Sequence, residues 1–179
     1  MGDTIRIANC SGYYGDRLDA AREMVTGGPI DVLTGDYLAE LTMKILYDQR
    51  EQRGAHMGYV GTFLKQVEDV VGLCLEKGIK IVTNAGGLNP AGMAAEVERI
   101  LEAQGLRARV AYIDGDDLIP HLADYQAEGE PFINIDKGTR LAESDNEVVT
   151  ANTYFGAWAI KEALDRGADI VICPRVTDA

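Results

Sequence analysis

Short runs of β-branched and aliphatic residues alternate along this chain with longer segments in which hydrophobic residues recur every three or four positions. The short runs are typical of strands and the longer spacing is typical of amphipathic helices. The pattern predicts strands at residues 5–8, 30–34, 79–83, 108–113 and 170–173. It predicts helices at 18–26, from Tyr37 to a polar loop at 48–54, at 60–77, at 90–105, briefly through His121 and Tyr125, and at 155–166.

The same spacing assigns an inward face to each helix. In the second helix this face carries Leu38, Leu41 and Ile45, and the third has a longer apolar stripe that ends at Cys74. In the last helix the residues expected to face inward are Phe155, Trp158, Ala159 and Ala163. Residues 132–135 and 147–150 flank a polar stretch and predict a small β-hairpin excursion near 130–150.

Strands separated by helices of this length favour right-handed crossovers and a parallel sheet that is covered on both faces. The predicted fold class is therefore α/β, a three-layer doubly wound sheet that is mostly parallel and has about five strands. Residues 1–179 are expected to form one domain, because 179 residues with 46% hydrophobic and 26% charged composition can bury a core without a disulfide or a metal.

Charge and cysteine content limit the partners and the cellular compartment that we expect for this protein. A net charge of −12 with scattered basic residues argues against a nucleic-acid partner, and no apolar run approaches the roughly 20 residues that span a bilayer, so no membrane partner is expected. The start of the chain has no basic leader, and Cys10, Cys74 and Cys173 are widely spaced without a CxxC motif. These features indicate a cytoplasmic protein, with Cys74 and Cys173 in the core.

Polar and small residues follow every predicted strand. The carboxyl ends of parallel strands meet at one edge of a sheet, where ligands bind, so segments distant in sequence are expected to lie together there. These segments are 9–11, 35–37, 84–87, 114–116 and 175–178. Caps and tight turns account equally well for residues 114–117, and Asp36 could be a simple cap.

Two segments exceed what a turn requires. Residues 84–90 contain consecutive glycines, which let the backbone approach a ligand, and Asn89 can cap a helix whose first turn holds Pro90. Asp36 and Glu40 are four residues apart, so both carboxylates fall on one face of a helix start.

Four strings of residues appear in order along the chain: Asn9-Cys10-Ser11-Gly12 with Gly15-Asp16-Arg17, Gly35-Asp36-Tyr37-Leu38-Ala39-Glu40-Leu41-Thr42, Asn84-Ala85-Gly86-Gly87-Leu88-Asn89-Pro90, and Arg175-Val176-Thr177-Asp178-Ala179. They resemble the signature segments of the acyclic terpene utilisation (AtuA-like) family. The resemblance implies bacterial catabolism of citronellol- and geraniol-type terpenes, with intermediates carried as acyl-coenzyme A thioesters. Family proteins continue beyond the position of Ala179 and more often have glycine where Pro174 stands, which implies that this chain corresponds to the N-terminal part. A partner chain, a second copy or a further segment is expected to complete the site.

The strand-end residues suit proton transfer beside a carbonyl group, such as the addition or removal of water at an unsaturated acyl thioester or related carboxylate. The candidate catalytic residues are Asp16, Asp36, Glu40, Asp178 and Cys10, the last because a thiolate is stabilised before a helix start. The candidate substrate-binding residues are Asn9, Ser11, Arg17, Asn84, Gly86, Gly87, Asn89, Asp114 and Arg175, with the amides of the two glycines facing a developing enolate.

The sequence also bears on cofactors and on a non-enzymatic alternative. No metal spacing, GxGxxG motif or phosphate loop is present, so no cofactor is predicted; a divalent ion held by strand-end carboxylates is the alternative. The expected ligand is a small acyl compound. The competing class is a non-catalytic subunit that binds an acyl ligand or serves as a scaffold in a multi-chain enzyme.

Overall fold

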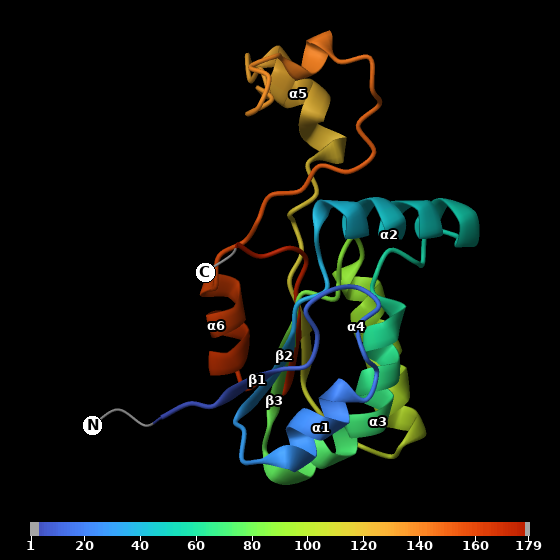
Figure 1. Ribbon diagram of the computed structural model, residues 1–179, viewed down its shortest axis with the longest axis vertical. Helices are drawn as coiled ribbons and strands as arrows, with labels where there is room; N and C mark the ends of the chain where they lie inside the picture. The colour runs from blue at the N-terminus through green and yellow to red at the C-terminus, as the bar shows by residue number, and fades with distance from the viewer. Residues whose placement is uncertain (1–3, 178–179) are drawn as a thin grey trace.

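A computed structural model describes residues 4–177, which form a five-stranded, all-parallel sheet (Figure 1). The strands are β1 (Ile7–Asn9), β2 (Val32–Gly35), β3 (Lys80–Thr83), β4 (Val110–Tyr112) and β5 (Ile170–Ile172). Their order across the sheet is β1-β2-β3-β5-β4, so β5 is inserted between β3 and β4. The predicted α/β class, the parallel sheet and the strand positions are confirmed.

This strand order fixes where the helices lie. The chain crosses the sheet in one direction from β1 to β4 and then reverses to reach β5, and right-handed crossovers therefore place the last helix on the opposite face. The first face carries α1 (Ala20–Gly27), α3 (Gly61–Lys77) and α4 (Pro90–Ala103), and the second carries α6 (Trp158–Asp165) (Figure 1). The result is a three-layer sandwich with unequal outer layers.

The larger core lies between the sheet and α1, α3 and α4. Leu33 and Ile81 from the strands are buried against Val67 and Val71 of α3, and Cys74 is buried there as predicted. A smaller cluster joins Val171 and Cys173 to α6. Because α6 packs on β5, the same face of β1 lacks this cover, and Ile5 and Ile7 are exposed.

The second helix differs from the prediction. Helix α2 (Glu40–Arg53) continues through the stretch expected to be a loop, and it begins at Glu40 instead of Tyr37. The interval is polar, but Lys44 pairs with Asp48 one turn later, and basic residues in the last turn suit the carboxyl end of a helix. Leu41 is exposed, which corrects its predicted inward position.

The inward face of α6 also differs from the prediction. Trp158 is 83% exposed and Phe155 precedes the helix, where it forms a bridge with Val176. The residues that pack on the sheet are Ile160, Ala163 and Leu164. Helix α6 is short and has apolar residues on two faces. The spacing in the sequence favoured the face with Trp158, whereas the structure packs the face with Ile160 and Leu164 on the sheet.

Residues 118–151, here called the arm, project beyond the carboxyl edge of the sheet (Figure 1). The arm contains the 3-10 turn η1 (Ile119–His121), α5 (Leu122–Ala127) and the 3-10 turn η2 (Leu141–Glu143). The predicted excursion near 130–150 is present, but residues 132–135 and 147–150 do not pair as a hairpin: Ile133 instead bridges Arg140 across a tight loop. The two ends of the arm are joined by backbone hydrogen bonds, including Leu118 N–H to the Ala151 carbonyl at 2.7 Å.

Among residues 4–177, no helix combines the length and the hydropathy that a membrane span requires.

Candidate functional site

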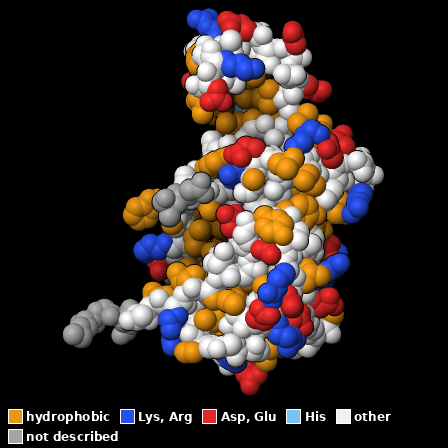
Figure 2. All heavy atoms as spheres, in the orientation of Figure 1, with side chains coloured by type: hydrophobic (Ala, Val, Ile, Leu, Met, Phe, Trp, Pro, Cys, Tyr) orange, Lys and Arg blue, Asp and Glu red, His pale blue; other side chains and the backbone are white. Residues whose placement is uncertain are grey.

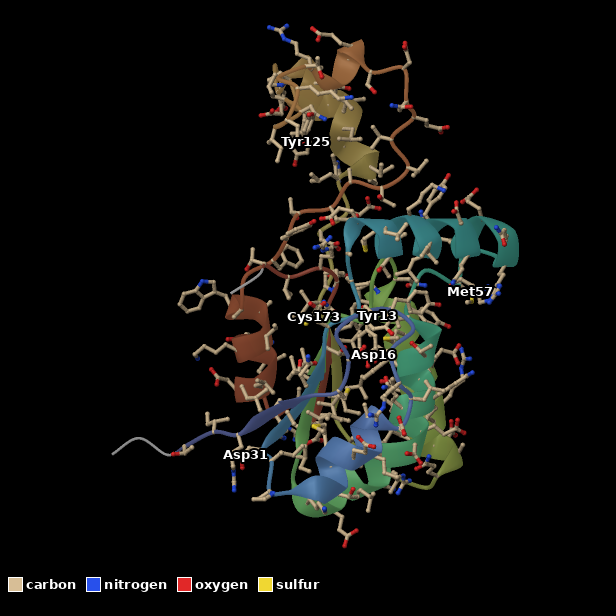
Figure 3. All side chains as sticks on the ribbon, viewed as in Figure 1. Tyr13, Asp16, Asp31, Met57, Tyr125 and Cys173 are labelled. Carbon is tan, nitrogen blue, oxygen red and sulfur yellow. The ribbon has the colours of Figure 1, made fainter. Side chains whose placement is uncertain are left out.

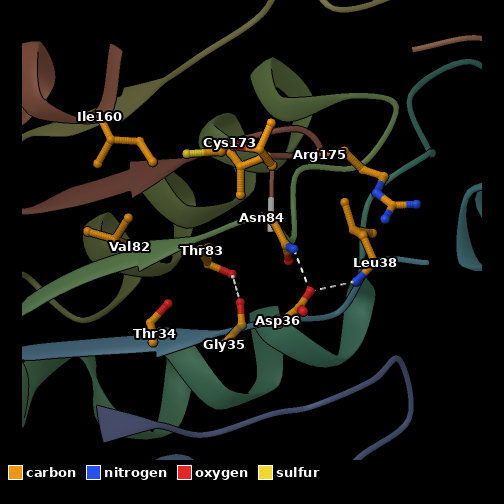
Figure 4. Close-up of a pocket in the computed structure, with 12 residues that line it drawn as sticks. Thr34, Gly35, Asp36, Leu38, Val82, Thr83, Asn84, Ile160, Cys173 and Arg175 are labelled. Carbon is orange, nitrogen blue, oxygen red and sulfur yellow. Dashed lines mark hydrogen bonds between the residues drawn. The ribbon is translucent and has the colours of Figure 1, made fainter. Parts of the chain in front are cut away.

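A pocket of about 280 Å³ opens where β2, β3 and β5 end, on the α6 side of the sheet (Figure 4). One end is apolar, with Val82 and Ile160, and the other end carries Asp36, Asn84 and Arg175. The hydrophobic side chains around it gather in a hollow between α6 and the strands (Figure 2). The lining residues are Thr34, Gly35, Asp36, Leu38, Val82, Thr83, Asn84, Ile160, Cys173, Arg175, Val176 and Thr177.

The Asp36 carboxylate is held by its neighbour on the adjacent strand end. Asn84 Nδ2 donates to Asp36 Oδ1 at 2.6 Å, and the Leu38 N–H reaches the same oxygen at 3.3 Å. The side-chain oxygen of Asn84, Oδ1, in turn accepts from the Tyr37 N–H at 2.9 Å. Within residues 4–177, no hydrogen bond reaches Asp36 Oδ2, so one carboxylate oxygen is anchored and the other is available at the pocket.

Arg175 lies at the same polar end and is only 8% exposed. Its Nη1 donates to Glu40 Oε1 at 2.9 Å, and the guanidinium lies over the Tyr154 ring at 4.2 Å. Tyr154 Oη donates to the same Glu40 oxygen at 2.7 Å. The hydrogen bond from Tyr154, followed by a backbone hydrogen bond at Glu40 itself and then by the bond and charge of Arg175, lowers the pKa of Glu40 from 4.5 to about 2. Glu40 therefore stays ionised and is a weak base.

Two further side chains in the pocket have structural roles. Thr83 Oγ1 donates to the Gly35 carbonyl at 3.2 Å and accepts from the Ala85 N–H at 3.1 Å, which ties the ends of β2 and β3 together. Cys173 is buried, and burial raises the pKa of its thiol to about 12. A neutral thiol of this kind is a poor nucleophile.

The amides of Gly86 and Gly87 face the backbone of the protein. Gly86 N–H donates to the Cys173 carbonyl at 3.1 Å and Gly87 N–H donates to the Asn84 carbonyl at 3.3 Å. A Cβ at position 86 would lie 2.6 Å from that Cys173 oxygen. These glycines allow close packing between strand ends, and their N–H groups are not directed at a ligand.

Asn89 likewise serves the fold. Its Oδ1 caps α4 by accepting from Gly92 N–H at 2.9 Å, as the sequence predicts, and its Nδ2 reaches the carbonyls of His56 and Met57. Neither Asn89 nor the two glycines lines the pocket.

The predicted residues of the first turn do not line the pocket, although the backbones of Cys10 and Ser11 bond those of the lining residues Thr34 and Asp36. Cys10 and Ser11 are buried, and burial raises the pKa of the Cys10 thiol. Asp16 lies in the turn after β1 (Figure 3), where Gly12 and Arg17 N–H groups bond its carboxylate and lower its pKa. Arg17 pairs with Asp19 and Glu23 on the surface. Asn9 is exposed and accepts a long bond from Ser11 N–H.

The remaining acidic residues near the strand ends lie in different places. Asp114 is exposed and lines a different hollow, together with Trp158. Its neighbour Asp116 is buried, accepts from Asn152 Nδ2 at 2.8 Å, and has a pKa raised by burial. Asp178 lies outside the described residues. Within residues 4–177, no three His, Cys, Asp or Glu side chains gather in a way that could hold a metal ion.

Sequence reasoning missed several lining residues. Thr34 and Thr83 are the polar members of their strands near the carboxyl edge, and their position after β-branched neighbours was a usable signal. Tyr154 and Ile160 come from segments whose approach to the site depends on the reversal that inserts β5. No local pattern carries that information.

The fold and the pocket define a doubly wound α/β protein whose pocket lies at the carboxyl edge of the sheet, the edge at which proteins of this class commonly bind ligands. Within this class, the chain belongs to the acyclic terpene utilisation family: the family model described as acyclic terpene utilisation family protein AtuA matches residues 5–179. Comparison with curated proteins and with solved structures finds no match.

Proposed function

We propose that this chain carries an acid–base site that adds water to, or removes it from, a branched or unsaturated acyl compound. The observation that carries the proposal is the Asp36 carboxylate, with Oδ1 fixed by Asn84 and Oδ2 available in a pocket whose far end is apolar. A base needs this combination of fixed orientation and access to the substrate. Membership of a terpene utilisation family supports an aliphatic, branched substrate.

The proposed step uses one carboxylate for both proton transfers. Asp36 accepts a proton from water as the water oxygen bonds to the β-carbon, and the electron pair of the double bond moves to the α-carbon and carbonyl oxygen as an enolate. Asp36 then returns the proton to the α-carbon, which gives the β-hydroxyacyl product. A second N–H on Asn84 Nδ2 could donate to the carbonyl oxygen, where the negative charge develops.

Turnover of a neutral enoyl thioester tests this function. Crotonyl and 3-methylcrotonyl thioesters of N-acetylcysteamine are offered to the full chain, and water addition is followed by loss of the conjugated absorbance. Asp36→Asn should lower the rate about 100-fold or more, because the amide cannot accept the proton. The control is Asp48→Asn, which removes a carboxylate of α2 that pairs with Lys44 away from the pocket. Equal rates in wild type and Asp36→Asn would refute the proposal.

A specific observation also favours a non-catalytic subunit that binds an acyl ligand or docks on a partner chain. Ile5, Ile7 and Trp158 are large hydrophobic side chains exposed to solvent. A second polypeptide or a second copy of this chain would cover such exposed apolar side chains. Native mass spectrometry of the purified assembly distinguishes self-assembly from a heteromer. Turnover by the chain alone would decide for the enzyme.

A further inference from the structure

Arg175 has more hydrogen-bond donors than the described residues around it use. The guanidinium has five N–H groups, and its side chain is only 10% exposed. Across the described part of the chain, Glu40 is the one side chain that accepts a hydrogen bond from it. Among residues 4–177, no nitrogen of Arg175 is both shut off from solvent and without a partner, so its remaining N–H groups face the hollows that the arginine lines.

The arginine is also held in place. Its carbonyl accepts from the Phe155 N–H at 3.2 Å, and the Thr177 N–H returns a bond to the Phe155 carbonyl at 2.9 Å. The preceding residue, Pro174, has a restricted backbone, and the guanidinium stacks on Tyr154. A guanidinium fixed in this way loses little conformational freedom when it binds a planar anion.

Glu40 is a partner that a ligand can replace. Its side chain is 81% exposed, whereas that of Arg175 is 10% exposed. An exposed carboxylate that leaves the pair regains full hydration, so the exchange opposes binding only weakly. Arg175 lines both the pocket at the strand ends and a neighbouring hollow of about 130 Å³, which also contains Glu40 and Tyr154.

We propose that Arg175 is an oxyanion-binding subsite, in which the guanidinium receives a carboxylate or phosphate group of the ligand while Glu40 moves aside. The arginine fork matches both anions with paired hydrogen bonds. Because the opposite end of the pocket is formed by Val82 and Ile160, the ligand is an amphipathic anion with its aliphatic part toward α6. This inference rests on the proposed function in one respect, which is that the pocket is the substrate site. It adds that the substrate carries a free anionic group.

The probes are octanoate, 1-octanol and inorganic phosphate, and binding to the full chain is measured by calorimetry. Octanoate is expected to bind about tenfold or more tightly than octanol, because only the carboxylate can pair with the arginine. Arg175→Lys should weaken octanoate binding about tenfold, since lysine lacks the planar fork, and should leave octanol unchanged. The matched control is Arg17→Lys, a surface arginine outside the pocket that pairs with Asp19 and Glu23.

If Arg175→Lys does not fold, Glu40→Gln tests whether Arg175 binds the anion. Removal of an exposed carboxylate that competes for the arginine should tighten octanoate binding several-fold, whereas a purely structural ion pair would leave it unchanged or weaker. Tight phosphate binding with weak octanoate binding would support the subsite and identify phosphate as its anion. Equal affinity for octanoate and octanol, without phosphate binding, would overturn the inference.

The two proposals fail separately. Asp36→Asn keeps Arg175 and should retain octanoate binding. A chain that binds octanoate through Arg175, but hydrates neither the neutral enoyl thioesters nor an enoyl thioester that carries a free carboxylate, would keep the subsite and lose the proposed reaction. Turnover that depends on Asp36, together with octanoate binding that is unchanged by substitutions of Arg175 and Glu40, would keep the proposed reaction and refute the subsite.

Discussion

The backbone at Gly87 combines two constraints on one residue. Its φ is +54°, a region that residues with a Cβ disfavour, and an added Cβ would lie 2.8 Å from the Gly58 carbonyl oxygen. Gly105 has a similar φ of +66° but nothing within 4 Å of that position. The two glycines therefore separate the conformational effect from the steric one.

Gly105→Ala is expected to lower the free energy of unfolding by about 1–2 kcal/mol, the cost of a left-handed alanine. Gly87→Ala should lower it by a further 1–3 kcal/mol or so, because the contact with Gly58 adds overpacking. Urea denaturation of both variants checks this. Equal losses would show that the loop at Gly58 relaxes freely and that the close approach does not constrain the strand end.

Single residues of the site were predictable when their place followed from a strand end. Asp36, Asn84 and Arg175 were named from sequence because parallel strands end at one edge, and the structure brings them to one pocket. The direction of an N–H group is not encoded in that way. Gly86 and Gly87 follow a strand as expected, yet their amides bond carbonyls of residues 173 and 84, because β5 lies beside β3.

Helix α6 offers a direct test of its own orientation. Ile160 packs against the sheet cluster, whereas Trp158 projects into solvent. Ile160→Ala should lower the free energy of unfolding by about 1–2 kcal/mol, less than for a fully buried isoleucine, because the residue is partly exposed. Trp158→Ala should change it by less than about 0.5 kcal/mol in the isolated chain, as for other exposed positions.

Both variants are compared by urea denaturation at low protein concentration. A large loss in Trp158→Ala would restore the orientation that the sequence pattern suggested and would contradict the structure. A loss that appears only at high concentration would show that the tryptophan is buried in an assembly.

Elements with a strong apolar period were predicted well, and elements stabilised by other means were not. The stripe on α3 leads to a long helix with six buried side chains, and the prediction matches it. The last turns of α2 have almost no stripe and depend on charge pairs and end effects, so the polar interval resembled a loop. In the arm, alternating apolar residues suggested a hairpin, but a strand pair without a third partner or a covering helix is marginal in water.

At the scale of the whole molecule, the body (residues 4–117 and 152–177) and the arm differ in how they are stabilised. No side chain between residues 117 and 151 is buried, whereas strands and helices of the body share a continuous core. The arm leaves and re-enters the body side by side, through the Asp117–Asn152 bridge and the Leu118–Ala151 hydrogen bond. The body should therefore fold without the arm.

Replacement of residues 119–150 by Asn-Gly joins Leu118 to Ala151 through a two-residue turn that suits antiparallel ends. The free energy of unfolding should stay the same or rise by up to about 2 kcal/mol, because a shorter loop costs less entropy to close. Thermal and urea denaturation measure the change, and a clear loss of stability would show that the arm contributes to the core. Octanoate binding gives the second readout, since Glu40, Tyr154 and Arg175 all remain. Retained affinity would assign the oxyanion subsite to the body alone, whereas lost affinity in a stable variant would mean that the arm closes over the bound ligand.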